Sequence, residues 1–245
     1  MPWPAQSPIE SRNEWLPASG RVEQLILLLH GWRSEGAAMA PLALALRGAF
    51  PQAAVLAPDS PLVFTRGEPQ PDHTGRSLGR NLGRMWYGIE GLTEDTWRRR
   101  VAACLPPIVA WTRAQQQRLG IGPAATALGG FSQGAILALA AVLREDGLAG
   151  RVLAFGGRFV APPAAAPLHT TVHLFHGSAD TVIPAEGSRE ALQRLGELQG
   201  DATLDIGEGV GHELHPALID CALHRLAHHI PNRTWRAAPG AAPTC

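Results

Sequence analysis

The sequence predicts a single α/β domain in which helices cover both faces of a mostly parallel central sheet. Short, continuous apolar runs alternate along the chain with longer stretches rich in alanine and leucine. Continuous apolar strands are typical of parallel sheets, because such strands are buried on both faces. The length of 245 residues and the hydrophobic content of 45% suit one large domain of this class.

Local patterns of apolar residues predict where the strands and helices lie. Short aliphatic runs predict buried strands, and longer stretches rich in alanine and leucine predict helices. The expected strands, in chain order, cover residues 22–29, 53–57, the apolar run that begins at 126, 151–155, 170–176 and 202–206. The expected helices cover residues 36–48, about 93–118, 134–145, 185–198 and 214–229. This alternation is the order of a parallel sheet with helical connections.

One predicted helix has a clear start and an internal obstacle. It begins near Thr93, whose hydroxyl can cap the first turn, and Glu94 and Asp95 suit the positive end of a helix. Pro106 and Pro107 follow within the same helix. Because proline lacks an N–H group and its ring clashes with the preceding turn, we expect the helix to break or kink there.

The chain divides into a main domain and two short ends. Residues 1–21 are proline-rich without periodicity and predict an extended arm, residues 22–232 form the single domain, and residues 233–245 are a low-complexity tail. Within the domain, residues 58–92 carry many glycines, prolines and arginines and almost no periodic apolar pattern. A structureless stretch of this length inside a domain is usually functional or disordered.

Composition argues against several classes of partner. The formal net charge is zero, which favours neither nucleic acid nor an anionic membrane as a partner. The longest aliphatic run, residues 25–29, is too short to span a membrane, and the N-terminus lacks the basic and apolar regions of a signal peptide. Cys104, Cys221 and Cys245 have neither disulfide nor metal spacing. We expect a cytoplasmic protein without stable membrane insertion, and the sequence does not indicate its oligomeric state.

A short motif after the apolar run at residue 126 indicates a nucleophile. The pentapeptide Gly130-Phe131-Ser132-Gln133-Gly134 precedes a helix rich in alanine and leucine. This is the G-x-S-x-G pattern of a nucleophile elbow, in the required context of strand, turn and helix. The turn strains the serine backbone, and glycine at both ends leaves room where a Cβ would clash. We expect Ser132 to present its hydroxyl above the edge of the sheet.

Two further residues have the properties of an acid and a base for this serine. Asp180 follows the strand at 170–176, and His212 follows the strand at 202–206 and a glycine-rich loop. The order Ser, Asp, His is that of α/β-hydrolases. In this interpretation His212 takes the hydroxyl proton, and Asp180 fixes the tautomer of His212 and stabilises the imidazolium.

Other residues compete for these roles on sequence alone. Asp205 lies inside a strand, where alternation predicts a surface position, and His215 stands at the entry to the last helix before Pro216. Phe131 points sideways from the elbow and is expected in the core rather than in a pocket. We therefore favour Asp180 and His212.

The oxyanion hole is expected between two loops. Backbone N–H groups of Gln133, directly after the nucleophile, and of Trp32, after the first predicted strand, are the expected donors. His30 is expected to hydrogen-bond the second of these loops. Trp86 and Tyr87 lie in the unpatterned stretch, where they either line an acyl groove or pin that stretch to the core.

Several motifs together resemble those of one known family. They are Leu-His-Gly at 29–31, Ala-Pro-Asp-Ser-Pro at 57–61, Met-Trp-Tyr at 85–87, Gly-Phe-Ser-Gln-Gly at 130–134, Ala-Phe-Gly-Gly-Arg-Phe at 154–159, His-Gly-Ser-Ala-Asp at 176–180 and Gly-His at 211–212. On these stretches the chain resembles the bacterial phospholipase/carboxylesterase group of α/β-hydrolases, which also contains acyl-protein thioesterases. Where many relatives carry a small residue and an acid after His-Gly, this chain has Trp32-Arg33-Ser34-Glu35, which alters the expected shape of the acyl pocket.

Three functional hypotheses follow from the sequence. The first is a serine carboxylic-ester hydrolase that forms an acyl-enzyme on short- to medium-chain esters, with thioesters as a close variant and no required cofactor. The second is a catalytically idle binding module, against which the complete triad argues. The third is a peptidase or lactone hydrolase on the same fold, against which the missing extra domain and the elbow serine argue. His224, His228 and His229 have helical spacing, and without a nearby cysteine we expect a solvated or half-buried helix face rather than a metal site.

Overall fold

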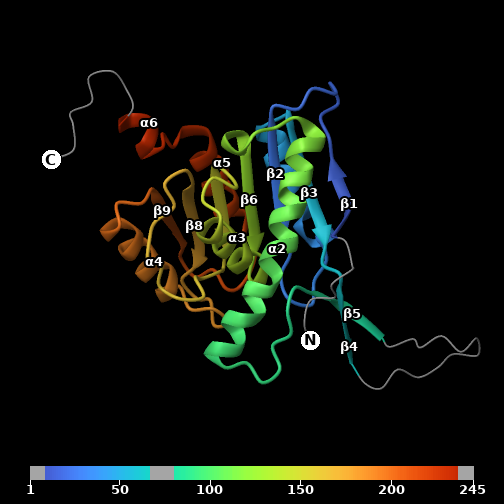
Figure 1. The fold of residues 1–245 in the computed structure, drawn as a ribbon, viewed down its shortest axis with the longest axis vertical. Helices are drawn as coiled ribbons and strands as arrows, with labels where there is room; N and C mark the ends of the chain where they lie inside the picture. Colours follow the sequence, from blue (N-terminus) through green and yellow to red (C-terminus); the bar gives the residue numbers. More distant parts are fainter. Residues whose placement is uncertain (1–8, 67–79, 237–245) are drawn as a thin grey trace, which may run out of the picture.

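A seven-stranded, mostly parallel sheet forms the centre of the molecule (Figure 1). The structure is a computed structural model and is described for residues 9–66 and 80–236. The strand order is β1-β3-β2-β6-β7-β8-β9; β1 pairs antiparallel with β3, and the other neighbouring strands are parallel. The strands are β1 (Glu10–Trp15), β2 (Gln24–Leu29), β3 (Ala53–Asp59), β6 (Thr126–Phe131), β7 (Arg151–Phe155), β8 (Thr171–Gly177) and β9 (Ala202–Gly207). Each strand expected from an apolar run is present.

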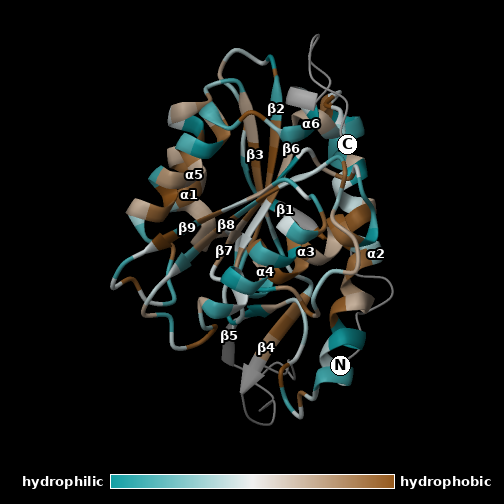
Figure 2. Ribbon diagram, turned by 90° about the vertical axis from the view of Figure 1, so that its left-hand side faces the viewer, coloured by the Kyte–Doolittle hydropathy of each residue, from teal (hydrophilic) through white to brown (hydrophobic). Residues whose placement is uncertain are grey.

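Helices cover both faces of this sheet. They are α1 (Ala40–Ala49), α2 (Glu94–Leu119), α3 (Gln133–Arg144), α4 (Glu186–Glu197), α5 (Pro216–His228) and α6 (Asn232–Arg236), with 3₁₀ turns at Gly36–Met39 and Pro123–Ala125. Viewed from the side, α1 and α5 lie on one side of the sheet, and α2 and α3 on the other (Figure 2). The molecule therefore has three layers, as expected from the alternation of strands and helices.

The two sides of strand β2 belong to two separate halves of the hydrophobic core. Leu25, Leu27 and Leu29 are buried in the cluster that contains residues of α2, α3 and α4. Ile26 and Leu28 are buried in the cluster that contains residues of α1 and α5. Successive side chains of a strand point to opposite faces, so an unbroken aliphatic run is needed where both faces are covered.

Helix α2 passes through its two prolines without a break. Thr93 caps the first turn, since its hydroxyl accepts a hydrogen bond from the N–H of Thr96, as the sequence predicted. Pro106 and Pro107 lie inside a continuous helix of 26 residues, so the expected break is absent, although α2 changes direction along its length (Figure 1). Burial of Ile108 and its neighbours against the sheet compensates for the hydrogen bonds that the prolines remove.

Both ends of the chain contain more regular structure than the sequence predicted. Within the predicted extended arm at 1–21, β1 pairs with β3 as an edge strand of the main sheet. Helix α6 includes residues 233–236 of the predicted low-complexity tail, whereas residues 1–8 and 237–245 lie outside the described part. An edge strand has a neighbour on one side only, so the polar segment of β1 carries no clear apolar pattern.

The unpatterned stretch at 58–92 contains a second, two-stranded sheet. Strands β4 (Leu62–Arg66) and β5 (Arg80–Met85) pair antiparallel, and residues 67–79 between them lie outside the described part. Backbone hydrogen bonds in both directions between Ser34 and Arg84 join this hairpin to the loop after β2. The guanidinium of Arg84 also contacts Asp59 and the carbonyl oxygen of Ser60. The hairpin therefore packs beside the loop expected to form half of the oxyanion hole.

Candidate active site

The strand–turn–helix at Ser132 has the strained geometry of a nucleophile elbow. Ser132 has a φ of 54° and a ψ of −116° and stands between the end of β6 and the start of α3. A Cβ on Gly134 would overlap the carbonyl of Leu29, and one on Gly130 would overlap the backbone of Gly134. The prediction that glycine is required at both ends of the turn is thus confirmed. The positive φ of Ser132 destabilises the turn, and the packing of the surrounding residues holds the turn in this conformation.

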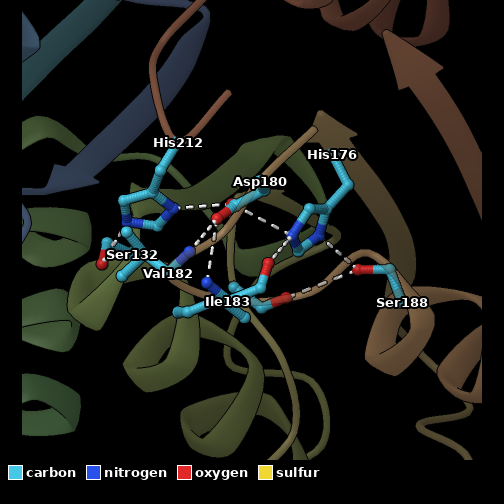
Figure 3. A network of polar contacts seen from close by, with 8 residues as sticks. Ser132, His176, Asp180, Val182, Ile183, Ser188 and His212 are labelled. Atoms are coloured by element: carbon cyan, nitrogen blue, oxygen red, sulfur yellow. Dashed lines mark hydrogen bonds and ion pairs between the residues drawn. The ribbon is translucent and has the colours of Figure 1, made fainter. Parts of the chain in front are cut away.

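Ser132, His212 and Asp180 converge at the carboxyl-terminal edge of the sheet (Figure 3). His212 Nε2 lies 2.9 Å from Ser132 Oγ, and His212 Nδ1 lies 2.6 Å from Asp180 Oδ2. The three residues follow β6, β8 and β9, whose parallel directions bring their following loops to one edge. The distances are those of a hydrogen-bonded relay in which an imidazole bridges a hydroxyl and a carboxylate.

The backbone after β8 holds the second oxygen of Asp180. Asp180 Oδ1 accepts hydrogen bonds from the N–H groups of Val182 at 2.9 Å and Ile183 at 2.8 Å. Burial by itself raises the pKa of Asp180, but the hydrogen bonds from His212, Ile183 and Val182 outweigh it, and the pKa lies below its ordinary value. Asp180 is therefore a carboxylate at neutral pH, oriented toward His212.

A second histidine, to which the sequence analysis assigned no role, contacts the same carboxylate. The fully buried His176 has its Nε2 atom 3.3 Å from Asp180 Oδ2 and 2.7 Å from the carbonyl oxygen of Ile183. Both partners are acceptors, so Nε2 carries a proton; on the other side of the ring, Nδ1 lies 2.7 Å from Ser188 Oγ (Figure 3). The signal in the sequence was the place of His176 at the start of the motif His-Gly-Ser-Ala-Asp, four residues before Asp180.

The competing candidates lie elsewhere. Asp205 forms a bidentate ion pair with Arg225, both contacts being 2.9 Å long. His215 caps the start of α5 by accepting a hydrogen bond from the N–H of Ala217, in keeping with its expected position at the helix entry. Neither Asp205 nor His215 is hydrogen-bonded to Ser132 or His212 among the contacts of the described residues.

The expected oxyanion donors flank the nucleophile on two loops. Gln133 is the first residue of α3, so its N–H has no acceptor within the helix and is available to a ligand. Trp32 follows Gly31, and a Cβ at Gly31 would lie 3.4 Å from the Cβ of Ser132, which shows how closely this loop approaches the nucleophile. His30 Nδ1 lies 2.8 Å from the carbonyl oxygen of Gly31, so the expected hydrogen bond of His30 to this loop is confirmed.

A pocket of about 900 Å³ opens in front of Ser132. Its wall is mostly apolar and includes a few charged residues; the lining residues are Gly31, Trp32, Ser34, Tyr87, Ile89, Leu92, Trp97, Phe131, Ser132, Gln133, Ile136, Arg158, Val182, Ile183, Pro184, Glu186, Gly187, Glu190 and His212. Tyr87 lines this pocket, but Trp86 does not. Trp86 is fully buried, and its indole N–H donates to the carbonyl oxygen of His30, so the expectation that Trp86 is a pocket wall is corrected.

Phe131 also departs from expectation. It lines the pocket and packs against the ring of His212 with ring centroids 4.7 Å apart, whereas the sequence placed it in the core alone. Phe131 is the last residue of β6 and is only partly buried, so it packs against the core cluster of α1 and α5 and also lines the pocket.

Comparison with known proteins identifies the family. The model of the phospholipase/carboxylesterase family matches residues 16–230. The chain belongs to this family. Esterase YpfH of Escherichia coli (strain K12) is 38% identical over 209 residues, which cover 85% of this chain and 84% of that protein. The crystal structure of esterase PE8 has a TM-score of 0.76 and 31% identity and covers 90% of this chain and 99% of that chain.

A third relative matches a shorter part of the chain. Acyl-protein thioesterase 1 of Gibberella zeae is 30% identical over 109 residues, covering 41% of this chain and 46% of that protein. The family and its esterase members confirm the α/β-hydrolase fold and the resemblance predicted from the sequence. The protein is a carboxylesterase-type hydrolase.

Three further features concern the histidines of α5, metal binding and membrane-spanning helices. His224 and His228 stack on an exposed helix face with ring centroids 4.5 Å apart. Within residues 9–66 and 80–236, no three side chains of His, Cys, Asp or Glu are grouped so that they could hold a metal ion. In the same ranges, none of the helices is both long and apolar enough to cross a membrane.

Proposed function

We propose that the protein hydrolyses carboxylic esters of short- to medium-chain acyl groups through a Ser132–His212–Asp180 triad. The observation that carries this proposal is the unbroken relay from Ser132 Oγ through His212 to Asp180, with contacts of 2.9 and 2.6 Å. A serine hydroxyl is a weak nucleophile at its ordinary pKa and requires an adjacent base. His212 is the only imidazole with a contact to Ser132 Oγ among the described residues.

The reaction would proceed in two halves. Ser132 Oγ attacks the acyl carbonyl while His212 Nε2 takes its proton, and His212 then returns that proton to the departing alkoxide. Water, activated by His212, attacks the resulting acyl-enzyme and releases the acid. Asp180 accepts a hydrogen bond from His212 Nδ1, which fixes the tautomer with a free Nε2 lone pair and stabilises the imidazolium. The step sequence requires no metal or organic cofactor.

The oxyanion of each tetrahedral intermediate would be bound by the N–H groups of Trp32 and Gln133. Both residues line the pocket beside Ser132. Gln133 additionally stands at the positive end of the 12-residue helix α3. Loss of one such donor typically lowers kcat by about 10² to 10³, so the placement of these two loops is a large part of the expected rate enhancement.

The pocket supports an acyl substrate of limited length. Its wall is largely apolar, and Ile89 and Leu92 stand partly exposed at its rim. A volume of about 900 Å³ lies near the upper end of ordinary ligand pockets and accommodates a small or medium ester. The partial similarity to acyl-protein thioesterase 1 favours acyl thioesters as the second candidate substrate class, since both reactions use the same groups. We also propose the cytoplasm as the location, where Cys104 and Cys221 would remain free thiols, as they are in the structure.

A panel of chromogenic esters from acetyl to palmitoyl tests the proposal. The purified protein is expected to hydrolyse the shorter members fastest, and Ser132→Ala to lower the rate by several orders of magnitude while the melting temperature stays near that of the unmodified protein. A matched thioester for each acyl group distinguishes the second candidate by comparison of kcat/KM. Equal hydrolysis by pure Ser132→Ala protein would contradict the triad, and no hydrolysis of any member would favour a binding module.

A further inference from the structure

Trp86 lies between the two loops that are expected to carry the oxyanion donors. It follows β5 directly and belongs to the segment of residues 84–87 that leaves the hairpin. Trp86 is fully buried, while Tyr87 beside it reaches the pocket. The backbone N–H of Trp86 and its indole N–H donate hydrogen bonds to two different loops.

The first direction leads to the nucleophile elbow. The backbone N–H of Trp86 donates to Gln133 Oε1 at 3.1 Å, and Gln133 Nε2 donates to the carbonyl oxygen of Tyr87 at 3.0 Å. Both hydrogen-bonding groups of the Gln133 side chain are therefore used on the 84–87 segment. Gln133 is 4% exposed, so these bonds are shielded from water and tie the first residue of α3 to this segment.

The second direction leads to the loop after β2. The indole N–H of Trp86 donates to the carbonyl oxygen of His30 at 2.8 Å, and the two rings lie 5.1 Å apart. His30 Nε2 accepts from the N–H of Ser60, so the proton is on Nδ1, which donates to the carbonyl oxygen of Gly31. Burial lowers the pKa of His30 to about 4, which keeps this ring neutral at physiological pH. The indole of Trp86 is thus hydrogen-bonded to the backbone of His30, two residues before Trp32.

We propose that Trp86 is a positioning residue that sets the separation between the N–H groups of Trp32 and Gln133. The inference rests on the proposed function, since it assigns the oxyanion hole to these two groups. A continuous path of hydrogen bonds runs from Gln133 Oε1 through the backbone and indole of Trp86 to the carbonyl oxygen of His30. One oxyanion donor belongs to Gln133 itself, and the other, the N–H of Trp32, is two residues from His30. Preorganised donors bind the oxyanion without having to move, so a shift of either loop weakens binding of the transition state more than binding of the substrate.

Trp86→Phe tests this assignment, because phenylalanine keeps an aromatic ring in the core and removes the indole N–H. The expected result is a fall in kcat of about 10-fold or more, a part of the 10² to 10³ that loss of a whole donor causes, with KM changed by less than about two-fold. Trp111→Phe is the matched control. Trp111 is a buried tryptophan of α2 whose indole N–H has no hydrogen-bond partner in the described part of the chain, so its replacement is expected to leave kcat unchanged.

A pair of inhibitors separates positioning from general damage to the fold. A trifluoromethyl ketone forms a tetrahedral adduct with Ser132 whose oxyanion occupies the hole, whereas the corresponding methyl ketone binds chiefly as a substrate analogue. In Trp86→Phe, the inhibition constant of the trifluoromethyl ketone is expected to rise by the same factor by which kcat/KM falls, and that of the methyl ketone to stay within about two-fold.

Gln133→Met provides a second variant should Trp86→Phe fold poorly. It removes both side-chain hydrogen bonds of Gln133 to residues 86 and 87 while keeping the backbone N–H of residue 133. It is expected to change kcat and the two inhibition constants in the same way as Trp86→Phe. The double variant should have a kcat only slightly below that of the less active single variant. The inference is overturned if Trp86→Phe and Gln133→Met each keep kcat and the trifluoromethyl ketone affinity within two-fold. Absence of Ser132-dependent hydrolysis in the unmodified protein would instead overturn the proposed function and, with it, this inference.

Discussion

At the scale of single residues, the structure surrounds one carboxylate with more donors than a catalytic relay requires. Asp180 accepts hydrogen bonds from His212 and from two backbone N–H groups, and it lies 3.3 Å from the protonated Nε2 of His176. His176 is itself oriented by Ser188. Each donor favours the ionised form of Asp180 and restricts its rotation, so the carboxylate presents one fixed oxygen to His212.

Replacing His176 tests whether this orientation contributes to the reaction. His176→Phe removes the Nε2–H donor and is expected to lower kcat/KM by about 10-fold, because Asp180 then turns more freely relative to His212. His176→Gln places an amide N–H near the original donor and is expected to recover part of the loss. The measurement is kcat/KM for one ester together with the melting temperature. If the Phe and Gln variants lose activity only in proportion to their stability, His176 has a packing role alone.

Individual residues also show how far sequence reasoning reaches. Ser132 was predicted from the elbow motif, and Asp180 and His212 from their chain order and from their positions after recognisable strands, whose parallel arrangement brings the following loops to one edge. The contacts of His176 and Trp86 depend on which way a buried side chain turns, and no periodicity encodes that direction. Trp86 in particular lies in a stretch without an apolar pattern, where the competing interpretations, pocket and core, have the same sequence signature.

At the scale of elements, the elbow depends on close packing between a strand end and a helix start. Helix α3 begins so near β2 that Gly134 meets the carbonyl of Leu29. Gly134→Ala is expected to be severely destabilising, because the overlap is with backbone that cannot move without displacing β2 from the sheet. Activity is expected to fall together with the melting temperature.

The control for that substitution is a glycine with open space around it. Gly48 lies in the last turn of α1, and no atom stands within 4 Å of the position of an added Cβ. Gly48→Ala is expected to raise stability by at most roughly 0.5 kcal/mol, since alanine is the better helix former and the gain is smaller in the last turn than in a helix interior. The two variants are compared by chemical denaturation, and a Gly134→Ala protein as stable as the unmodified one would contradict the packing argument.

Elements that were predicted less well are those whose stability comes from tertiary contacts. The strands of the sheet interior are buried on both faces and therefore have continuous apolar sequences, and all of them were predicted. Strand β1 is a polar edge strand, and the hairpin β4–β5 is joined to the domain by Ser34 and Arg84, so neither needs a continuous apolar pattern. Helix α2 persists through Pro106 and Pro107 because its buried face spans both sides of them.

At the scale of the whole molecule, the parallel sheet serves two purposes. It directs the ends of β2, β6, β8 and β9 to one edge, where the reacting groups gather, and it buries polar side chains along with the apolar ones. His30 at the end of β2 and His173 inside β8 are both fully buried. Burial lowers the pKa of His30 to about 4 and, with the nearby positive groups, that of His173 to about 3.

These two histidines predict that the protein loses stability in mild acid. Their pKa values in the folded protein lie below the ordinary value of 6.5, so the unfolded chain binds more protons as the pH falls from about 6.5 toward 4. The free energy of unfolding therefore decreases through that window, by roughly 3 kcal/mol for His30 alone. Above about pH 6.5 both histidines are neutral in the folded and in the unfolded protein, so stability is highest there and does not depend on their titration.

His173→Asn tests the prediction through a slope rather than an absolute stability. Asparagine keeps a polar atom near the position of Nδ1, where His173 lies 2.8 Å from Thr203 Oγ1, and it does not titrate. Melting temperatures of the unmodified protein and of the variant are measured from about pH 7 to about pH 4.5. The unmodified protein is expected to lose more stability across this range than the variant, even if the variant is less stable at neutral pH. Parallel pH profiles would mean that His173 does not become protonated on unfolding, and that the acid sensitivity of the fold arises elsewhere.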